Sequence, residues 1–197
     1  MTHHEGMLLR LSPLLTSVLS PADLPLAELT AARLDGELYG LADCYCPVDV
    51  TADAAVRAAA LRAELPHERL IAEQHSAAWI WGALDQSPRP HRLAAAIGAR
   101  VGRRSSSWMR VREVVIASDD LVETGGLGVT RPLRTALDLL RAPSFGSEER
   151  AIVAALMVIG GFDAAQCARH IDSRRNLPHK HEAAARLRSV GQPELTR

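Results

Sequence analysis

The chain has 197 residues, 23% of them charged and 47% hydrophobic, with a formal net charge of zero at pH 7. This length suffices to bury a core in one large or two small domains, and the composition excludes a disordered chain. Because no apolar run approaches the roughly 18 residues that cross a bilayer, no membrane partner is expected.

The cysteines and the first residues point to the cytoplasm. The three cysteines, Cys44, Cys46 and Cys167, are an odd set that does not make a disulfide framework and is typical of a reducing compartment. The N-terminal stretch contains an apolar run like that of a signal peptide, but histidine and glutamate stand at residues 3–5, where such a peptide needs positive charge. We therefore expect a soluble, cytoplasmic protein.

Charge is distributed unevenly along the chain. Residues 1–90 contain six arginines against twelve acidic residues, whereas residues 91–197 contain seventeen basic residues against eleven acidic ones. One interpretation is that the basic half faces a polyanion. The other is that the two halves attract each other, or a second copy of the chain in a homodimer.

The first fifty residues predict a small helical module closed by a hairpin. The apolar period indicates a helix over Met7–Leu19, starting near Ser12, then a turn at residues 20–23 and a second helix over Leu24–Leu34. Residues Glu37–Val50 combine apolar side chains with glycine and proline and favour a short β-hairpin. Helices followed by a hairpin outline a reduced winged helix, which we assign to residues 1–50.

Residues 51–197 predict a mixed α/β domain that ends in helices, so the expected fold class is α/β in the α+β sense. Two helices are expected first, Asp53–Leu65, capped by Thr51 or Asp53, and Ser76–Gly82. Strands follow at residues 91–99, 108–116, 121–124 and 127–129, with a glycine-rich hairpin turn at 125–128. Four helices complete the chain, at 130–141 with Thr130 as cap, at 147–159 with Ser147 as cap, at 162–173 and at 178–190.

The densest basic segment lies between Asp85 and Glu113, where no acidic residue interrupts the arginines. Guanidinium groups beside serine hydroxyls, as in residues 102–107, suit contacts to phosphate, and Trp108 could stack on a base. The alternative is the solvated tip of a hairpin with a buried tryptophan. The members of this arginine cluster are Arg89, Arg92, Arg100, Arg103, Arg104, Arg110 and Arg112.

A second basic patch is expected on the C-terminal helices. Its cations outnumber Asp172 and Glu182, and phosphate binding competes there with an ordinary solvated helix face. The cations are Arg169, Arg174, Arg175, Lys180, Arg186 and Arg188.

We find no complete catalytic or metal-binding motif, so we expect neither enzymatic activity nor a cofactor. Cys44 and Cys46 share one face of a strand, but no second pair supplies the remaining ligands of a zinc site. Asp119, Asp120 and Glu123 could hold Mg²⁺ in a phosphoryl-transfer enzyme, although the polar end of a strand and its turn explains them more simply. The sequence contains neither a Walker-type phosphate loop nor a nucleophile elbow.

Two tryptophans suggest a partner interface. Trp79 and Trp81 lie in the apolar segment predicted as a short helix, and residues at i and i+2 do not share one helical face. One of them is therefore expected to contact another domain or a protein partner, with a place in the core as the simpler alternative.

Three segments resemble the AbiEi-type antitoxins of actinobacteria. They are LPLAELTAARLDGELYGLADCYCPVD, EQHSAAWIWGAL, and a strand-rich stretch that contains RVREVVI and DDLVETGGLGVTRPLRTALDLLR. The resemblance covers about residues 21–142, and its most specific part is the pattern G-V-T-x-P-x-R-T-A-x-D-L, which ends at Leu139.

The resemblance implies an N-terminal winged-helix module and a C-terminal α/β domain. It also implies a repressor that binds the promoter DNA of its own operon and counteracts a cognate nucleotidyltransferase toxin. From the residues themselves, Arg134 and Asp138 stand at i and i+4 on one helix, which indicates a structural salt bridge rather than a catalytic pair.

Charge indicates which surface would bind double-stranded DNA. The second helix of the N-terminal module carries Glu28 and Asp35 against Arg33 alone, and phosphates repel an acidic helix. The alternative function is a protein-interaction module without DNA binding. We assign the nucleic-acid contacts to Arg100, Arg103, Arg104, Arg110, Arg112, Arg174 and Arg175.

Overall fold

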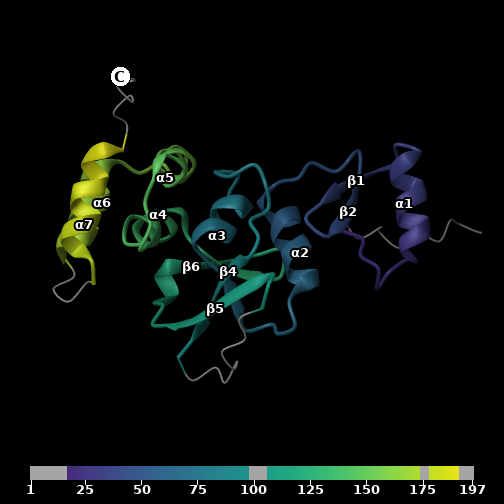
Figure 1. The fold of residues 1–197 in the computed structure, drawn as a ribbon, viewed down its shortest axis with the longest axis horizontal. Coiled ribbons are helices and arrows are strands. Elements are labelled where there is room, and N and C mark those ends of the chain that lie inside the picture. Colours follow the sequence, from purple (N-terminus) through teal and green to yellow (C-terminus); the bar gives the residue numbers. More distant parts are fainter. Residues whose placement is uncertain (1–16, 98–105, 174–177, 191–197) are drawn as a thin grey trace, which may run out of the picture.

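Two small helical parts lie at opposite ends of a central sheet, so the molecule is elongated (Figure 1). Helix α1 (Leu26–Leu34) and a two-stranded hairpin form one end, and α6 (Ala164–Ser173) with α7 (Lys180–Ser189) forms the other. This computed structural model describes residues 17–97, 106–173 and 178–190. The chain is mixed α/β and ends in helices, so the predicted fold class is confirmed.

The N-terminal module contains the predicted helix and hairpin. Strands β1 (Leu38–Leu41) and β2 (Cys44–Pro47) pair antiparallel, and α1 contributes a single buried residue, Leu29. The helix predicted over Met7–Leu19 is wrong at its described end, because the backbone of Leu19 pairs with Tyr45 through hydrogen bonds of 2.7 and 2.8 Å. The rest of that predicted helix lies outside the described residues.

Helix α2 (Ala54–Glu64) follows and carries the predicted cap. The Asp53 carboxylate accepts a hydrogen bond from the backbone N–H of Val56 at 2.9 Å, which satisfies one of the donors that a helix start leaves open. The buried face of α2 packs against the hairpin as well as the sheet, because the thiol of Cys44 donates to the carbonyl of Ala60 at 3.6 Å. The two sides of the boundary predicted near residue 50 therefore share one core.

The central sheet has five strands in the order β5-β4-β3-β7-β6. Strands β4 and β5 run parallel, with Arg92 opposite Arg110. The hairpin considered for the segment between them is therefore wrong, since parallel strands need a crossover rather than a tight turn. The middle strand was not predicted. The strands are β3 (Leu70–Ala72), β4 (His91–Ala96), β5 (Met109–Val114), β6 (Leu121–Thr124) and β7 (Leu127–Thr130).

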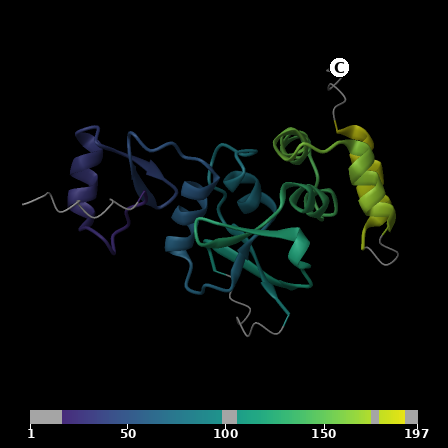
Figure 2. The same cartoon turned by 180° about the vertical axis from the view of Figure 1, so that it is seen from behind.

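One face of this sheet is covered by α2 and by α3 (Gln74–Ile80), as the two opposite views show (Figures 1 and 2). The side chains of Leu93 and Val111 point to that side and join the core around Trp79. Because side chains alternate along a strand, the intervening residues Arg92 and Arg110 lie on the opposite face. That face carries the arginines of β4 and β5.

The C-terminal helices form a second core. This core includes Leu139 and Leu156. It lies between α4 (Pro132–Leu140), α5 (Ser147–Gly160), α6 and α7. Two predicted caps are wrong. Arg131, not Thr130, precedes α4 because Thr130 ends β7, and Gly146, not Ser147, precedes α5, with its N–H bonded to the Glu149 carboxylate at 2.7 Å.

The two tryptophans have different places. Trp79 is 1% exposed and belongs to the central core, so it is not on a surface that a partner could contact. Trp81 is half-buried between the two cores, and its indole N–H donates to the carbonyl of Thr130 at 2.9 Å. One of the two tryptophans was expected to contact another domain or a protein partner. Trp81 makes such a contact within this chain, with the second core.

None of the helices in the described ranges is by itself long and apolar enough to cross a membrane. Helices α5 and α6 reach that length and composition only together, and they meet at a bend of 99°.

The turn between β6 and β7 predicts a sharp difference between two neighbouring glycines. Gly125 has φ +55°, and a Cβ there would lie 2.2 Å from the carbonyl oxygen of Ala55 and 2.7 Å from the backbone nitrogen of Ala59 in α2. Gly126 has φ +71° with open space around it.

We expect Gly125→Ala to lower the free energy of unfolding by about 3 kcal/mol, combining left-handed strain with overpacking. Gly126→Ala should cost about 1 kcal/mol through strain alone. Urea unfolding followed by circular dichroism measures both, and equal losses would contradict the close approach of the turn to α2.

Candidate nucleic-acid interface

Two arginines stand side by side on the uncovered face of the sheet. Arg92 on β4 and Arg110 on β5 are register partners, so their side chains leave the sheet in the same direction. Within the described ranges, neither guanidinium has an ion pair or a side-chain hydrogen bond. Like charges opposite each other destabilise a sheet, so this arrangement favours an external anion. We call Arg92, Arg110 and Arg112 the basic sheet face.

Arg112 is the member of this face that is already paired. Its guanidinium donates to both carboxylate oxygens of Glu73 at 2.5 Å, and Glu73 is 2% exposed at the end of β3. Burial raises the pKa of Glu73, while the bidentate contact with Arg112 acts in the opposite direction. To reach Glu73 the Arg112 side chain crosses β4 where its register partner is the small Ala94. The charge of Arg112 is therefore neutralised by Glu73, and its side chain mainly forms part of the surface of this face.

A cavity of about 220 Å³ lies on this face. Glu73, Gln74, Arg92, Arg110 and Arg112 line it. Its cations outnumber its single carboxylate, which Arg112 already neutralises. Arg92 and Arg110 are thus the two positive charges that remain for a ligand.

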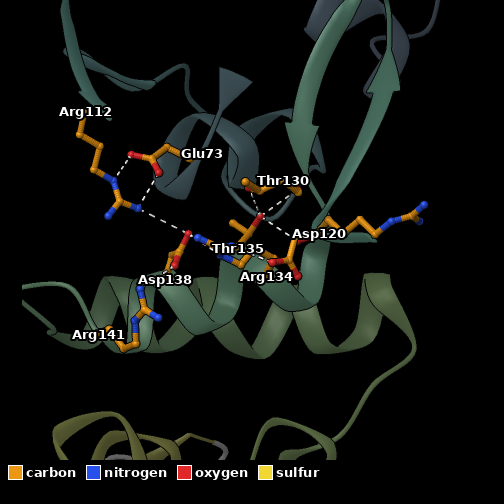
Figure 3. Close-up of polar contacts among 9 residues, drawn as sticks. Glu73, Arg112, Asp120, Thr130, Arg134, Thr135, Asp138 and Arg141 are labelled. Carbon is orange, nitrogen blue, oxygen red and sulfur yellow. Dashed lines mark hydrogen bonds and ion pairs between the residues drawn. The ribbon is translucent and has the colours of Figure 1, made fainter. Parts of the chain in front are cut away.

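Asp138 organises a buried ionic network beside this cavity (Figure 3). Its Oδ2 atom accepts from the Nε of Arg134 at 3.0 Å and lies 3.5 Å from the Nη2 of Arg112, while its Oδ1 accepts from Arg141 at 3.1 Å. The carboxylate side chain is 1% exposed. The predicted structural salt bridge between Arg134 and Asp138 is confirmed, and it is one contact of a larger cluster.

The same network includes Asp120, which the sequence analysis considered as a ligand for Mg²⁺. The Nη1 of Arg134 donates to Asp120 Oδ2 at 2.7 Å. Among the described residues no three His, Cys, Asp or Glu side chains converge as metal ligands. The Mg²⁺ site considered at Asp119, Asp120 and Glu123 is therefore wrong, because Asp120 is held by Arg134.

The threonines of the specific sequence pattern join β7 to α4. The Thr135 hydroxyl lies 2.7 Å from that of Thr130 and 3.0 Å from the carbonyl oxygens of Thr130 and Arg131, and both threonine side chains are fully buried (Figure 3). These contacts satisfy polar groups at the strand-to-helix junction. The pattern G-V-T-x-P-x-R-T-A-x-D-L thus describes a junction and its ionic network.

Arg89 ties the N-terminal hairpin to the central part. Its guanidinium pairs with Asp43 at the hairpin turn and with Glu64 on α2, the latter at 3.0 Å. Glu64 also accepts the backbone N–H of Asp43 at 3.1 Å. The hairpin tip, which would be the wing of a winged helix, is therefore an acidic tip bound to its own chain.

The C-terminal basic patch is partly structural. Arg186 on α7 donates to the carbonyls of Leu140 and Ala142, at 2.9 and 2.6 Å, and so caps the end of α4. Lys180 lies 3.5 Å from Asp172. Five residues assigned to nucleic-acid contact, Arg100, Arg103, Arg104, Arg174 and Arg175, lie outside the described residues.

A buried serine–histidine pair does not make a hydrolytic site. Ser76 Oγ lies 3.2 Å from His91 Nδ1, and Glu64 lies 3.8 Å from His91 Nε2, which reverses the order of a catalytic triad. Both Ser76 and His91 are fully buried, and burial lowers the pKa of His91 to about 4. Ser76 Oγ also accepts the backbone N–H of Arg92 at 2.8 Å, so the pair anchors the start of β4.

The cysteines are inert in this fold. Cys44, Cys46 and Cys167 are buried free thiols. Burial raises the pKa of Cys44 to about 12 and that of Cys167 to about 11, which keeps both thiols protonated at neutral pH.

No family model matches the chain, and no curated protein matches it. Among solved structures it is similar to the crystal structure of the RV2827C protein from Mycobacterium tuberculosis, with a TM-score of 0.47 and 17% sequence identity. The alignment covers 90% of this chain and 73% of that one. A likeness at this level assigns neither fold nor function.

The Asp138 network predicts a large loss of stability on a minimal change. Asp138→Asn keeps the shape but removes the negative charge that three guanidinium groups face. Arg112 keeps Glu73 and Arg134 keeps Asp120 as partners, so the loss is that of the charged hydrogen bonds at Asp138. We expect the free energy of unfolding to fall by about 2 kcal/mol. The matched control is Asp119→Asn at an exposed position, which should change it by less than about 0.5 kcal/mol. Similar urea midpoints for the two variants would contradict a central role for Asp138.

Proposed function

We propose that this chain is a DNA-binding regulator of the AbiEi antitoxin type, without enzymatic activity, and that its basic sheet face contacts the phosphate backbone. One observation carries the proposal. Arg92 and Arg110 stand opposite each other with no acidic partner among the described residues, on a face that no described helix covers. Phosphate contacts supply most of the non-specific affinity of DNA-binding proteins, and paired arginines suit them.

The sequence between the two strands is also basic. It contains Arg100, Arg103 and Arg104, which lie outside the described residues. The N-terminal module offers less, because Glu28 and Asp35 flank Arg33 on α1 and the hairpin tip is neutralised by Arg89. The basic sheet face is therefore the better candidate surface in the described chain.

The resemblance to AbiEi antitoxins supports the rest of the proposal. In that reading the DNA is the promoter of the chain's own operon, and the protein partner is a nucleotidyltransferase toxin that the chain counteracts. Regulation of a toxin operon would place the chain in the cytoplasm.

Charge reversal on the sheet tests the DNA surface. We expect Arg110→Glu to weaken binding to the chain's own upstream duplex about tenfold. The slope of log affinity against log salt concentration should fall by the amount expected for the loss of about one to two phosphate contacts. The control is Arg33→Glu on the acidic helix α1, which should change binding little. Fluorescence anisotropy across a salt series, with a scrambled duplex beside the upstream one, measures both. The surface is misassigned if Arg33→Glu is the more damaging variant.

The segment between the strands is tested separately. Reversal of Arg103 and Arg104 together should lower affinity for DNA and further reduce the salt slope. An unchanged slope in the same anisotropy series would remove these two residues from the interface.

A second candidate function, a protein-interaction module, rests on exposed leucines of the N-terminal module. Leu24, Leu26 and Leu34 are 39%, 57% and 82% exposed. Leu26 and Leu34 lie on α1 and Leu24 lies just before it. Exposed large apolar side chains on one short segment are typical of contact surfaces. An acidic, apolar helix of this kind suits a protein partner better than a nucleic acid.

Leu34 tests this second candidate. We expect Leu34→Ser to weaken capture of a co-expressed nucleotidyltransferase from the same operon about tenfold, without loss of stability, because the side chain is exposed. Val158→Ser on α5, where the side chain is 83% exposed, is the matched control and should not affect capture. Equal capture by both variants and the unchanged chain would rule out α1 as the contact surface.

A further inference from the structure

The second half of α5 is apolar on every side. Residues 151–160 read AIVAALMVIG and contain no charged or polar side chain. A helix of this kind is normally buried all round, whereas a surface helix carries polar residues on its outer side. Both views nevertheless show α5 farther from the sheet than α4, at the outside of the molecule (Figures 1 and 2).

The exposed side of α5 carries two large apolar residues. The opposite side packs into the second core, whereas Val158 and Ile159 are 83% and 44% exposed. Ala151 is exposed as well, and Ala154 and Ala155 are half-buried. At 3.6 residues per turn these five side chains lie on one side of the helix. We call them the outer face of α5.

The outer face is self-complementary in shape. Ala151 and Val158 lie two turns apart on one stripe of the helix, with Ala154 and Ala155 between them. A second copy of α5 can pack antiparallel on this face about a two-fold axis beside Ala154 and Ala155. Each Val158 then lies against the Ala151 of the other copy. A large side chain thus meets a small one, and the central alanines let the two helices approach closely.

A charge of opposite sign stands at each end of the outer face. Glu148 is exposed at the start of α5. Arg131 is exposed at the other end, because it precedes Pro132 in α4, and a Cβ added to Gly160 would lie 2.9 Å from the Cβ of Pro132. Neither Glu148 nor Arg131 has an ion pair within the described ranges. Glu148 and Gly160 are about 18 Å apart along the helix, so the two charges stay separate within one copy.

An antiparallel pair of α5 helices brings these charges together. Each Glu148 then lies at the end of α5 that adjoins Arg131 of the other copy, so two ion pairs form. A parallel pair would place the two Glu148 side chains against each other, and like charges repel. Charge and shape therefore favour the same arrangement.

We propose that a second copy of this chain covers the outer face of α5, in a homodimer whose α5 helices pack antiparallel about a two-fold axis. Val158 of each copy packs on Ala151 of the other, and Glu148 of each pairs with Arg131 of the other. One pair of helices buries less than the roughly 800 Å² per partner of a standard interface, so the dimer dissociates in the micromolar range. The dimer does not depend on DNA binding.

Charge reversal tests the ion pairs, with sedimentation velocity of the full chain over a concentration series as the measurement. At low salt we expect Glu148→Arg and Arg131→Glu, each alone, to weaken association about tenfold, because like charges then meet in two places. Both changes in one chain exchange the charges and should restore association to within about threefold of the unchanged chain. A loss of stability cannot give this rescue, and thermal unfolding followed by circular dichroism checks that each variant is folded.

Val158→Ser tests the apolar part of the contact. It should weaken association at least about tenfold, because each dimer loses two buried side chains. The matched control is Leu34→Ser on α1, where the side chain is equally exposed, and this variant should associate like the unchanged chain. Val158→Ser remains a valid control for capture through α1, since the two contacts use different helices.

Three results would overturn the dimer. A chain that stays monomeric throughout the series leaves the outer face to an occupant other than a second copy. Association that Leu34→Ser weakens and Val158→Ser does not takes place through α1 instead. Single reversals that weaken association without rescue in the double variant show that Glu148 and Arg131 do not meet across the interface.

Discussion

The carboxylate of Asp138 is buried at the junction of the sheet and the C-terminal helices, and the rest of the structure depends on how that charge is neutralised. A buried charge that loses its partners costs several kcal/mol, so every element that supplies a partner is fixed in position. Arg134 and Arg141 come from the same helix and its end, whereas Arg112 comes from β5. Through Arg112 the network reaches Glu73 on the middle of the sheet, and through Arg134 it reaches Asp120 before β6.

Ion pairs also determine which arginines remain for binding. In the sequence the arginine cluster contains no acid, which suggests a uniformly available basic surface. In the fold, Arg112 forms an ion pair with Glu73, and Arg89 forms ion pairs with Asp43 and Glu64. The described part of the cluster is thereby reduced to Arg92 and Arg110, which the parallel register places side by side. A small number of well-placed cations suits a specific surface better than a diffuse one.

Local patterns explain which parts of the structure could be predicted. The N-cap at Asp53, the hairpin at β1 and β2, the glycine turn before Leu127 and the i, i+4 pair at Arg134 depend on residues close together in sequence. Strand β3 could not be predicted, because three residues carry no period and its place comes from pairing with two distant strands.

The partners of the candidate site escaped prediction for the same reason. Glu73 is 39 residues from Arg112, and Glu64 is 25 residues from Arg89. Alternation along β5 correctly separated Arg110 and Arg112 from Met109 and Val111, which are buried. No local signal, however, indicated that one of those two arginines would be paired and the other would not. The contact of Trp81 with the carbonyl of Thr130 likewise joins residues 49 apart.

The place of β3 has a consequence for synthesis on the ribosome. One edge of this strand pairs with β4, which follows it closely, but its other edge pairs in parallel with β7, where Ile71 lies opposite Gly128. Until residues 127–130 have left the exit tunnel, the middle strand of the finished sheet is an edge strand with open hydrogen-bonding groups. Such edges are where nascent chains associate wrongly. A transcript that ends before β7 would therefore yield a chain prone to aggregation rather than a smaller stable domain.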